Sequence, residues 1–291
     1  MHKKLWGILF ILGNTGVECS VPVLCLSEHV YEIVPDVAPL ETKEYTVAVY
    51  IAARNELAPY VLANLHAMMR VGSTDNLTIV VHLDSIIKNN GMRTQRFIVY
   101  KDKIVQVGEL PAMDSGHPDT LIDFCRWAFT QFPCRQPMLM LWSHGMGDLE
   151  IENHMHALDA SHLRYHGISN LLSGSRSVEF NLSRGICFDD ITGHALTNHE
   201  VGHALALVRD TCLGGEPFAC VLCDACLMQS IGFMYSMKPH GKKPVARLLI
   251  GSQEAVFASG YDYYRTLLPL SRGNMPLTDF ATHVVNGNKV R

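Results

Sequence analysis

The sequence predicts an α/β protein with a mostly parallel β-sheet and helices on both of its faces. Two observations support this. Short continuous apolar runs, such as residues 46–53 (TVAVYIAA) and 77–83 (LTIVVHL), are typical of buried strands. They alternate with segments whose apolar residues recur at helical spacing, as in residues 56–71. This alternation indicates strand–helix–strand units, in which neighbouring strands run parallel.

The remaining elements continue the alternation. Residues 97–107 (FIVYKDKIVQV) predict a hairpin that turns near Lys101–Lys103. A helix over 121–132 leads into an apolar strand within 137–147. The later expectations are a helix over 197–208, a strand within 218–228, a short helix over 227–237, a strand over 245–250 and a helix over 277–286.

Composition sets broad limits on function. Apolar residues make up 48% and charged residues 18%, as in an ordinary globular protein. The net charge of -4 offers no basic footprint, so nucleic acid is not an expected partner. Nine cysteines are an odd number, so at least one thiol stays free. Their uneven spacing within apolar patterns is not that of a disulfide scaffold.

Residues 1–44 are expected to be an N-terminal leader and linker. Lys3 and Lys4 precede the apolar run 5–12 (LWGILFIL), which matches the start of a secretory signal. The run is too short to span a bilayer, which needs about 20 apolar residues, so no stable membrane span is expected. An ordinary first strand is the alternative. The location is therefore expected to be secreted or extracytoplasmic, with a cytoplasmic one as the alternative.

Two strand ends carry groups suited to catalysis. The strand within 218–228 (FACVLCDACLM) delivers Cys226, and the strand within 137–147 (PMLMLWSHGMG) delivers His144 followed by Gly145. Active-site groups of open α/β sheets gather at this edge, and neighbouring strands lie about 4.8 Å apart. The pair would then form a nucleophile and its proton-transfer partner, with the Gly145 and Cys226 N–H groups as an oxyanion hole. A buried structural cysteine and an unrelated histidine are the alternative.

Two metal-site patterns also occur. His199, Glu200 and His203 fit H-E-x-x-H, which on a helix supplies two zinc ligands and a base, but no third ligand follows. An amphipathic helix is favoured there.

The second pattern is Cys220-x-x-Cys223-x-x-Cys226, which has the spacing of an iron–sulfur motif without a fourth ligand. Residues three apart in a strand face opposite sides, so these thiols cannot converge on one metal. The same alternation places Asp224 on the face of Cys226.

These motifs together resemble the clostripain-like cysteine peptidases, which belong to a larger group with caspases, legumain and gingipain. Five stretches carry the resemblance and run in order: 49–84, 120–148, 185–205, 224–237 and 250–264. The resemblance implies a caspase-like α/β/α sandwich over residues 45–291, with a long loop at 149–185. It also implies hydrolysis of peptide bonds in protein or peptide substrates.

The resemblance further implies roles for single residues. Cys226 would be the nucleophile and His144 would protonate the leaving amine. Asp224 and Glu254 would line the pocket that accepts Arg or Lys before the cleaved bond. The chemistry would need no cofactor, although some relatives use calcium. Self-processing would fall in the loop 149–185, where the candidate positions are Arg164, Arg176 and Arg184.

Two departures from the family pattern keep another function open. Asp148 stands where relatives commonly have an aromatic residue after the His-Gly turn, and the sequence ends at Arg291, where many relatives continue. A catalytically inactive relative that binds peptides or a protein partner is therefore the alternative function.

Overall fold

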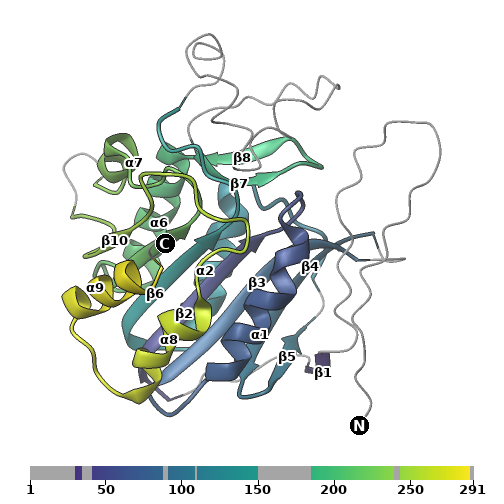
Figure 1. Ribbon diagram of the computed structural model, residues 1–291, viewed down its shortest axis with the longest axis vertical. Coiled ribbons are helices and arrows are strands. Elements are labelled where there is room, and N and C mark those ends of the chain that lie inside the picture. The colour runs from purple at the N-terminus through teal and green to yellow at the C-terminus, as the bar shows by residue number, and fades with distance from the viewer. Residues whose placement is uncertain are drawn as a thin grey trace.

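The computed structural model describes residues 30–34, 41–87, 91–108, 110–149, 185–238 and 243–288. An eight-stranded sheet runs through the molecule in the order β1-β5-β4-β3-β2-β6-β9-β10 (Figure 1). Only β4 is antiparallel to its neighbours, β3 and β5, so the predicted mostly parallel sheet is confirmed. The strands are β1 (Val30–Val34), β2 (Lys43–Ala52), β3 (Leu77–Ile87), β4 (Gly91–Tyr100), β5 (Lys103–Val107), β6 (Cys134–Trp142), β9 (Cys220–Asp224) and β10 (Leu249–Ile250).

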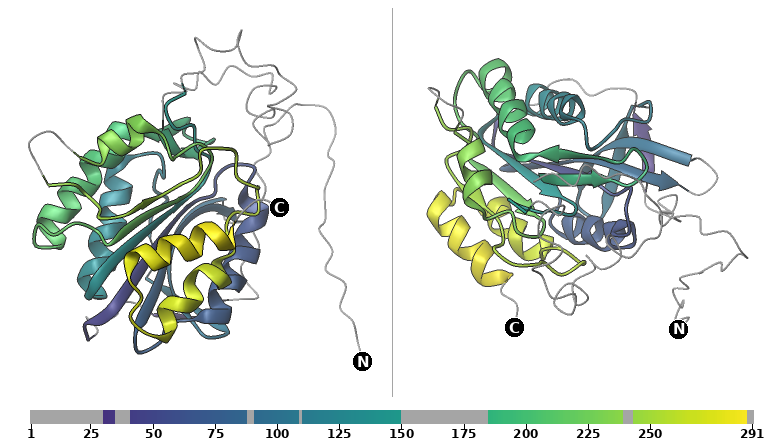
Figure 2. Two further views of the ribbon diagram at one scale, coloured as in Figure 1. Left: turned by 60° about the vertical axis from the view of Figure 1, so that its left-hand side comes forward. Right: turned by 90° about the horizontal axis from the view of Figure 1, so that it is seen from above.

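Helices cover both faces of the sheet, which gives three layers (Figure 2). One face packs against α1 (Val61–Val71), α8 (Tyr263–Arg272) and α9 (Leu277–Gly287). The other packs against α2 (Pro118–Gln131), α6 (Asn198–Cys212) and α7 (Ile231–Ser236).

The strands are apolar on both sides because both sides are covered. In β2, Val47 and Val49 join the core beneath α1, whereas Ala48 and Tyr50 join the core beneath α2. A strand buried in this way appears in the sequence as a continuous apolar run rather than an alternating one.

The predicted strand–helix–strand unit is present as β2, α1 and β3, and the two strands are parallel neighbours. The helix starts at Val61 instead of residue 56, since the short helix η1 (Ala58–Tyr60), which contains Pro59, precedes it. The predicted hairpin is β4–β5, and Asp102 adopts a φ of 61° in its turn.

Several elements differ from the sequence expectations. Five residues of the expected linker form β1, which pairs with β5 at the edge of the sheet. The strand expected over 245–250 is shortened to β10, with one further bridge at Ala246. Helix α8 was not predicted, although Asp262 caps its first turn by accepting the Arg265 N–H at 3.0 Å.

A second, two-stranded sheet lies beside the carboxyl end of β6. It consists of β7 (Gly185–Asp189) and β8 (His194–Thr197), and was not predicted. Cys187 N–H donates to the His144 carbonyl at 3.2 Å, and Met146 N–H donates to the Gly185 carbonyl at 2.9 Å. The hairpin therefore holds the turn that carries His144.

Some predictions lie outside the described residues. These are the secretory-signal pattern in residues 1–12 and the three arginines proposed for self-processing, Arg164, Arg176 and Arg184. Within the described ranges, no helix has the length and apolar character needed to cross a membrane.

Candidate active site

The thiol and the imidazole come from adjacent parallel strands. Strands β6 and β9 pair in register, with Trp142 opposite Asp224. His144 and Cys226 each follow two residues later, so the strand adjacency on which their pairing depends is present. Both line one cavity of about 560 Å³. The other lining residues are Glu56, Leu57, Tyr60, Trp142, Ser143, Asp224, Ala225, Val256, Phe257, Ala258, Ser259 and Gly260.

The Cys226 thiol is largely buried and is contacted by a neighbouring loop. Its exposed fraction is 8%, and the Val256 N–H donates to Sγ at 3.2 Å. Burial raises the pKa of Cys226, and the negative charge of Asp224 adds to that rise, while the Val256 N–H acts in the opposite direction. Because the net pKa is raised, the resting thiol needs a base to remove its proton.

The His144 ring faces a carboxylate that the sequence analysis did not identify. Its Nε2 lies 3.0 Å from Oε1 of Glu56. Burial acts to raise the pKa of Glu56, but the contact with His144 and its charge outweigh this, and the net pKa is lowered. One feature of the sequence could have identified Glu56. It is an acid that follows closely after a buried strand, at the edge of the sheet where His144 also lies.

A buried acid lies within the cavity. Asp224 accepts the Tyr261 N–H at Oδ2 (3.0 Å), whereas Oδ1 forms no hydrogen bond of regular geometry among the described residues. The Tyr263 hydroxyl lies close to the carboxylate and, like the Tyr261 N–H, acts to lower its pKa. Burial raises the pKa of Asp224 to about 7. Gly260 packs against it with a φ of 71°, and a Cβ there would lie 2.5 Å from Oδ2 and 3.0 Å from Trp142 Nε1. The cavity therefore requires glycine at position 260.

The other two predicted site residues lie outside the lining of this cavity. The Glu254 side chain is exposed, and its backbone carbonyl accepts the Leu227 N–H at 3.2 Å. Gly145 packs against the turn that carries the thiol, since a Cβ there would lie 2.5 Å from the Cys226 carbonyl oxygen and 2.9 Å from Ala225 Cβ. In this arrangement, Gly145 allows the turns that carry His144 and Cys226 to approach closely.

The cysteine pattern on β9 behaves as strand geometry predicts. Cys220 belongs to the core beneath α1 and Cys223 to the core beneath α2, so the two thiols lie on opposite faces of the sheet. All seven cysteines in the described ranges are free.

The H-E-x-x-H segment forms the start of α6, and its glutamate caps the first turn of that helix. Glu200 Oε2 accepts the Thr197 N–H at 2.9 Å, and Thr197 Oγ1 accepts the Glu200 N–H at 3.1 Å, which is a capping box. His199 and His203 are exposed neighbours with ring centroids 4.2 Å apart. The described residues contain no cluster of three or more His, Cys, Asp or Glu side chains that could hold a metal ion.

The three-layer α/β/α sandwich around a mostly parallel sheet is the caspase-like fold, and it places a thiol and an imidazole at adjacent strand ends. A sequence profile described as the clostripain family matches residues 49–180 and 165–288, and the chain belongs to that family. A search of curated proteins finds no match.

Solved structures share the fold at low sequence identity. One is a secreted C11 cysteine protease from Bacteroides thetaiotaomicron in complex with an irreversible peptide inhibitor. It is 22% identical with a TM-score of 0.57, and the match covers 84% of this chain and 58% of that one. Another is an inactive zymogen C11 protease from Parabacteroides distasonis. It is 20% identical with a TM-score of 0.57, and the match covers 87% of this chain and 59% of that one. The chain thus spans 58–59% of the length of these two relatives.

Proposed function

We propose that this protein is a cysteine endopeptidase that cleaves peptide bonds after Arg or Lys. One observation carries the proposal: a thiol and an imidazole at adjacent strand ends share a cavity with the buried carboxylate of Asp224. This arrangement combines a nucleophile, a proton-transfer group and an acceptor for a cationic side chain.

The chemistry proceeds in two halves. His144 takes the proton from Cys226, and the sulfur attacks the carbonyl carbon before the scissile bond. The carbon–nitrogen bond breaks, and His144 returns the proton to the leaving amine. A water molecule then gives a proton to His144 and attacks the thioester carbon. The carbon–sulfur bond breaks, which releases the new carboxyl end, and His144 returns its proton to the Cys226 sulfur. The backbone N–H groups of Gly145 and Cys226 are proposed to stabilise the oxyanion.

Asp224 is proposed to select the substrate. A buried charged carboxylate is costly, and a guanidinium or ammonium group compensates its charge. Glu254 lies outside the cavity lining, so we assign the recognition of basic residues to Asp224.

Two further proposals follow from the sequence pattern and the relatives. Self-processing is proposed within residues 149–185, where Arg164, Arg176 and Arg184 match the expected specificity. A secreted or extracytoplasmic location is proposed from the secretory-signal pattern in residues 1–12, and it agrees with the description of one structural relative as secreted.

Covalent labelling tests the catalytic proposal directly. The protein is treated with an acyloxymethyl ketone that carries Arg, and the labelled residue is identified by mass spectrometry. Labelling at Cys226 is expected in the wild type and in Cys212→Ala, a control at a half-buried thiol outside the cavity lining. The Cys226→Ala variant should remain unlabelled and should fail to hydrolyse fluorogenic Arg and Lys peptides. Equal hydrolysis by Cys226→Ala, or a preference for Asp peptides, would refute the proposal.

An inactive, peptide-binding relative remains the second candidate. The observation that favours it is the resting state of Cys226, which is buried, has a raised pKa and is already hydrogen-bonded by the Val256 N–H. In that case basic peptides would bind with measurable affinity while the Arg ketone would leave Cys226 unmodified.

A further inference from the structure

Glu56 has the position of a third member of the catalytic group. Its Oε1 lies 3.0 Å from Nε2 of His144, and neither atom has a hydrogen-bond partner among the described residues. The distance is that of an ion pair, but the geometry is not that of an aligned hydrogen bond. The ring side chain is 7% exposed and the carboxylate 31%, so water screens this contact only in part.

The residue before Glu56 ties it to the His144 turn. Asn55 Nδ2 donates to the Ser143 hydroxyl at 3.2 Å and to the Phe188 carbonyl at 2.9 Å. Asn55 Oδ1 accepts the Leu57 N–H at 3.0 Å, which fixes the backbone on the far side of Glu56. Since Ser143 directly precedes His144, one buried amide side chain sets the relative position of the acid and the imidazole.

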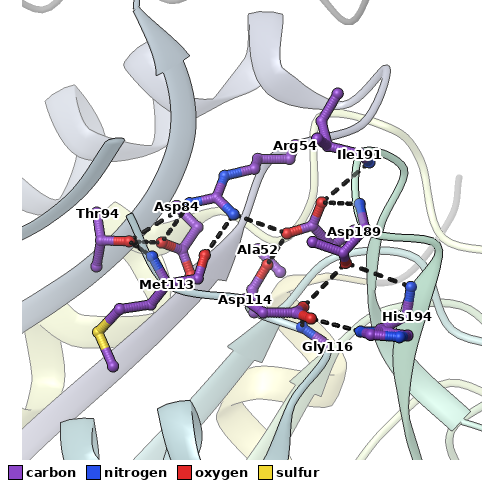
Figure 3. Close-up of polar contacts among 12 residues, drawn as sticks. Ala52, Arg54, Asp84, Thr94, Met113, Asp114, Gly116, Asp189, Ile191 and His194 are labelled. Carbon is purple, nitrogen blue, oxygen red and sulfur yellow. Dashed lines mark hydrogen bonds and ion pairs between the residues drawn. The ribbon is translucent and has the colours of Figure 1, made fainter. Parts of the chain in front are cut away.

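Arg54 anchors the same segment in the core (Figure 3). Its guanidinium lies between Asp84 (Nη2–Oδ1, 3.2 Å) and Asp189 (Nη1–Oδ2, 2.9 Å), and all three side chains are at most 1% exposed. The Arg54 carbonyl accepts the Asp190 N–H at 2.9 Å, which joins this segment to the end of β7. These contacts are made by buried groups, so the backbone that carries Glu56 is rigidly held.

A second carboxylate faces the pair. Asp190 is coupled electrostatically to both Glu56 and His144, and burial, followed by the charge of Glu56, raises its pKa to about 7 while His144 opposes the rise. The pKa of Glu56 is lowered instead. At neutral pH the charged carboxylate in direct contact with the ring is therefore that of Glu56.

We propose that Glu56 is a positioning residue that orients the His144 ring and stabilises its positive charge when the ring carries a proton. The inference rests on the proposed peptidase function. A fixed carboxylate beside an imidazole orients the ring and favours its protonated form, as in other catalytic groups of this kind. The substrate side chain would be bound elsewhere, by Asp224.

Three variants test this inference. Glu56→Gln keeps the size and removes the charge, Glu56→Asp keeps the charge, and Glu216→Gln is a matched control at an exposed acid paired with Lys243. With an Arg substrate, Glu56→Gln is expected to lower kcat roughly 10–100-fold, part of the 10²–10⁴-fold effect of acid–base catalysis, with little change in KM. Glu56→Asp should recover part of kcat, and Glu216→Gln should match the wild type.

The ring nitrogens of His144 give a readout that needs no turnover. In ¹H–¹⁵N spectra of labelled protein, the His144 signals should move in Glu56→Gln, move less in Glu56→Asp and stay unchanged in Glu216→Gln. An unchanged His144 signal in Glu56→Gln refutes the inference, as does a kcat within about twofold of wild type. If the wild type itself hydrolyses no basic peptide, the peptidase proposal fails while the spectra still decide the role of Glu56.

Discussion

Replacing Asp224 by Asn is expected to make the protein more stable and, at the same time, a much poorer peptidase. Asp224 is buried, its pKa is raised to about 7, and its Oδ1 forms no hydrogen bond of regular geometry among the described residues. Without substrate, the charged carboxylate therefore opposes folding. With a basic side chain in the cavity, the same carboxylate becomes the main source of attraction.

The size and sign of the stability effect follow from the pKa. A carboxyl whose pKa rises from 3.8 to about 7 on folding binds its proton more tightly in the folded state. Its contribution to stability is favourable below pH 3.8, and it is lost as the pH rises towards 7. Full ionisation of Asp224 lowers the free energy of unfolding by up to about 4 kcal/mol, because one pKa unit corresponds to ~1.4 kcal/mol. Asp224→Asn should thus stabilise the protein by as much as about 4 kcal/mol at pH 8, and by far less at pH 4.

The effect on catalysis should have the opposite direction. Loss of one partner from a buried charge pair typically costs about 2–5 kcal/mol. Because each ~1.4 kcal/mol is a factor of ten, kcat/KM for an Arg peptide should fall roughly 30- to 4,000-fold. The loss should be small for a peptide with a neutral residue at the same position.

Urea unfolding at pH 4 and pH 8, together with kcat/KM for Arg and neutral peptides, measures both effects. Asp279→Asn in α9 is a suitable control, since this acid is exposed and far from the cavity lining. The reasoning is refuted if Asp224→Asn is no more stable than wild type at pH 8. It is also refuted if Arg and neutral peptides lose activity equally.

Three further variants test the packing around the site. Gly145→Ala should lower the free energy of unfolding in urea by roughly 1–3 kcal/mol and slow the labelling of Cys226, because the added Cβ would overlap a backbone carbonyl. Gly287→Ala is the control, since a Cβ there would have nothing within 4 Å, and it should have neither effect. Asp148→Ala removes acceptors for an N–H of α7 and a side-chain amide of α6, and should cost roughly 1–3 kcal/mol by the same assay. Thr197→Ala should cost about 1 kcal/mol through loss of the α6 cap. Unchanged unfolding midpoints would contradict each expectation.

Asp148, which departs from the family pattern, makes hydrogen bonds that link two helices. The sequence analysis treated it as a departure from the family pattern that keeps an inactive relative open as the alternative function. Its carboxylate instead accepts the Gly232 N–H at 2.7 Å and an Asn198 Nδ2–H at 3.0 Å, which links α7 to α6. Asp148, four residues after His144, thus has a structural role.

The candidate site could be predicted in part. His144, Cys226 and Asp224 were recognisable because each follows or ends a continuous apolar run, and that signal is local. Glu56 and Val256 were missed because their contacts, with His144 and Cys226 respectively, join segments 88 and 30 positions apart in the chain. Glu254 was assigned to the pocket from its position in a family motif, whereas in the described structure its side chain is exposed outside the cavity lining.

The sequence by itself determined the α/β class, the strands that end in a thiol and an imidazole, and the opposite orientations of Cys220 and Cys223. These properties depend on side-chain periodicity and on where an apolar run stops, which are local features of the chain. The tertiary structure alone decided which strands are neighbours, which carboxylate faces His144 and which acid lies in the cavity. Those outcomes depend on packing between distant segments, because burial and contact distance set both the pKa values and the geometry of the site.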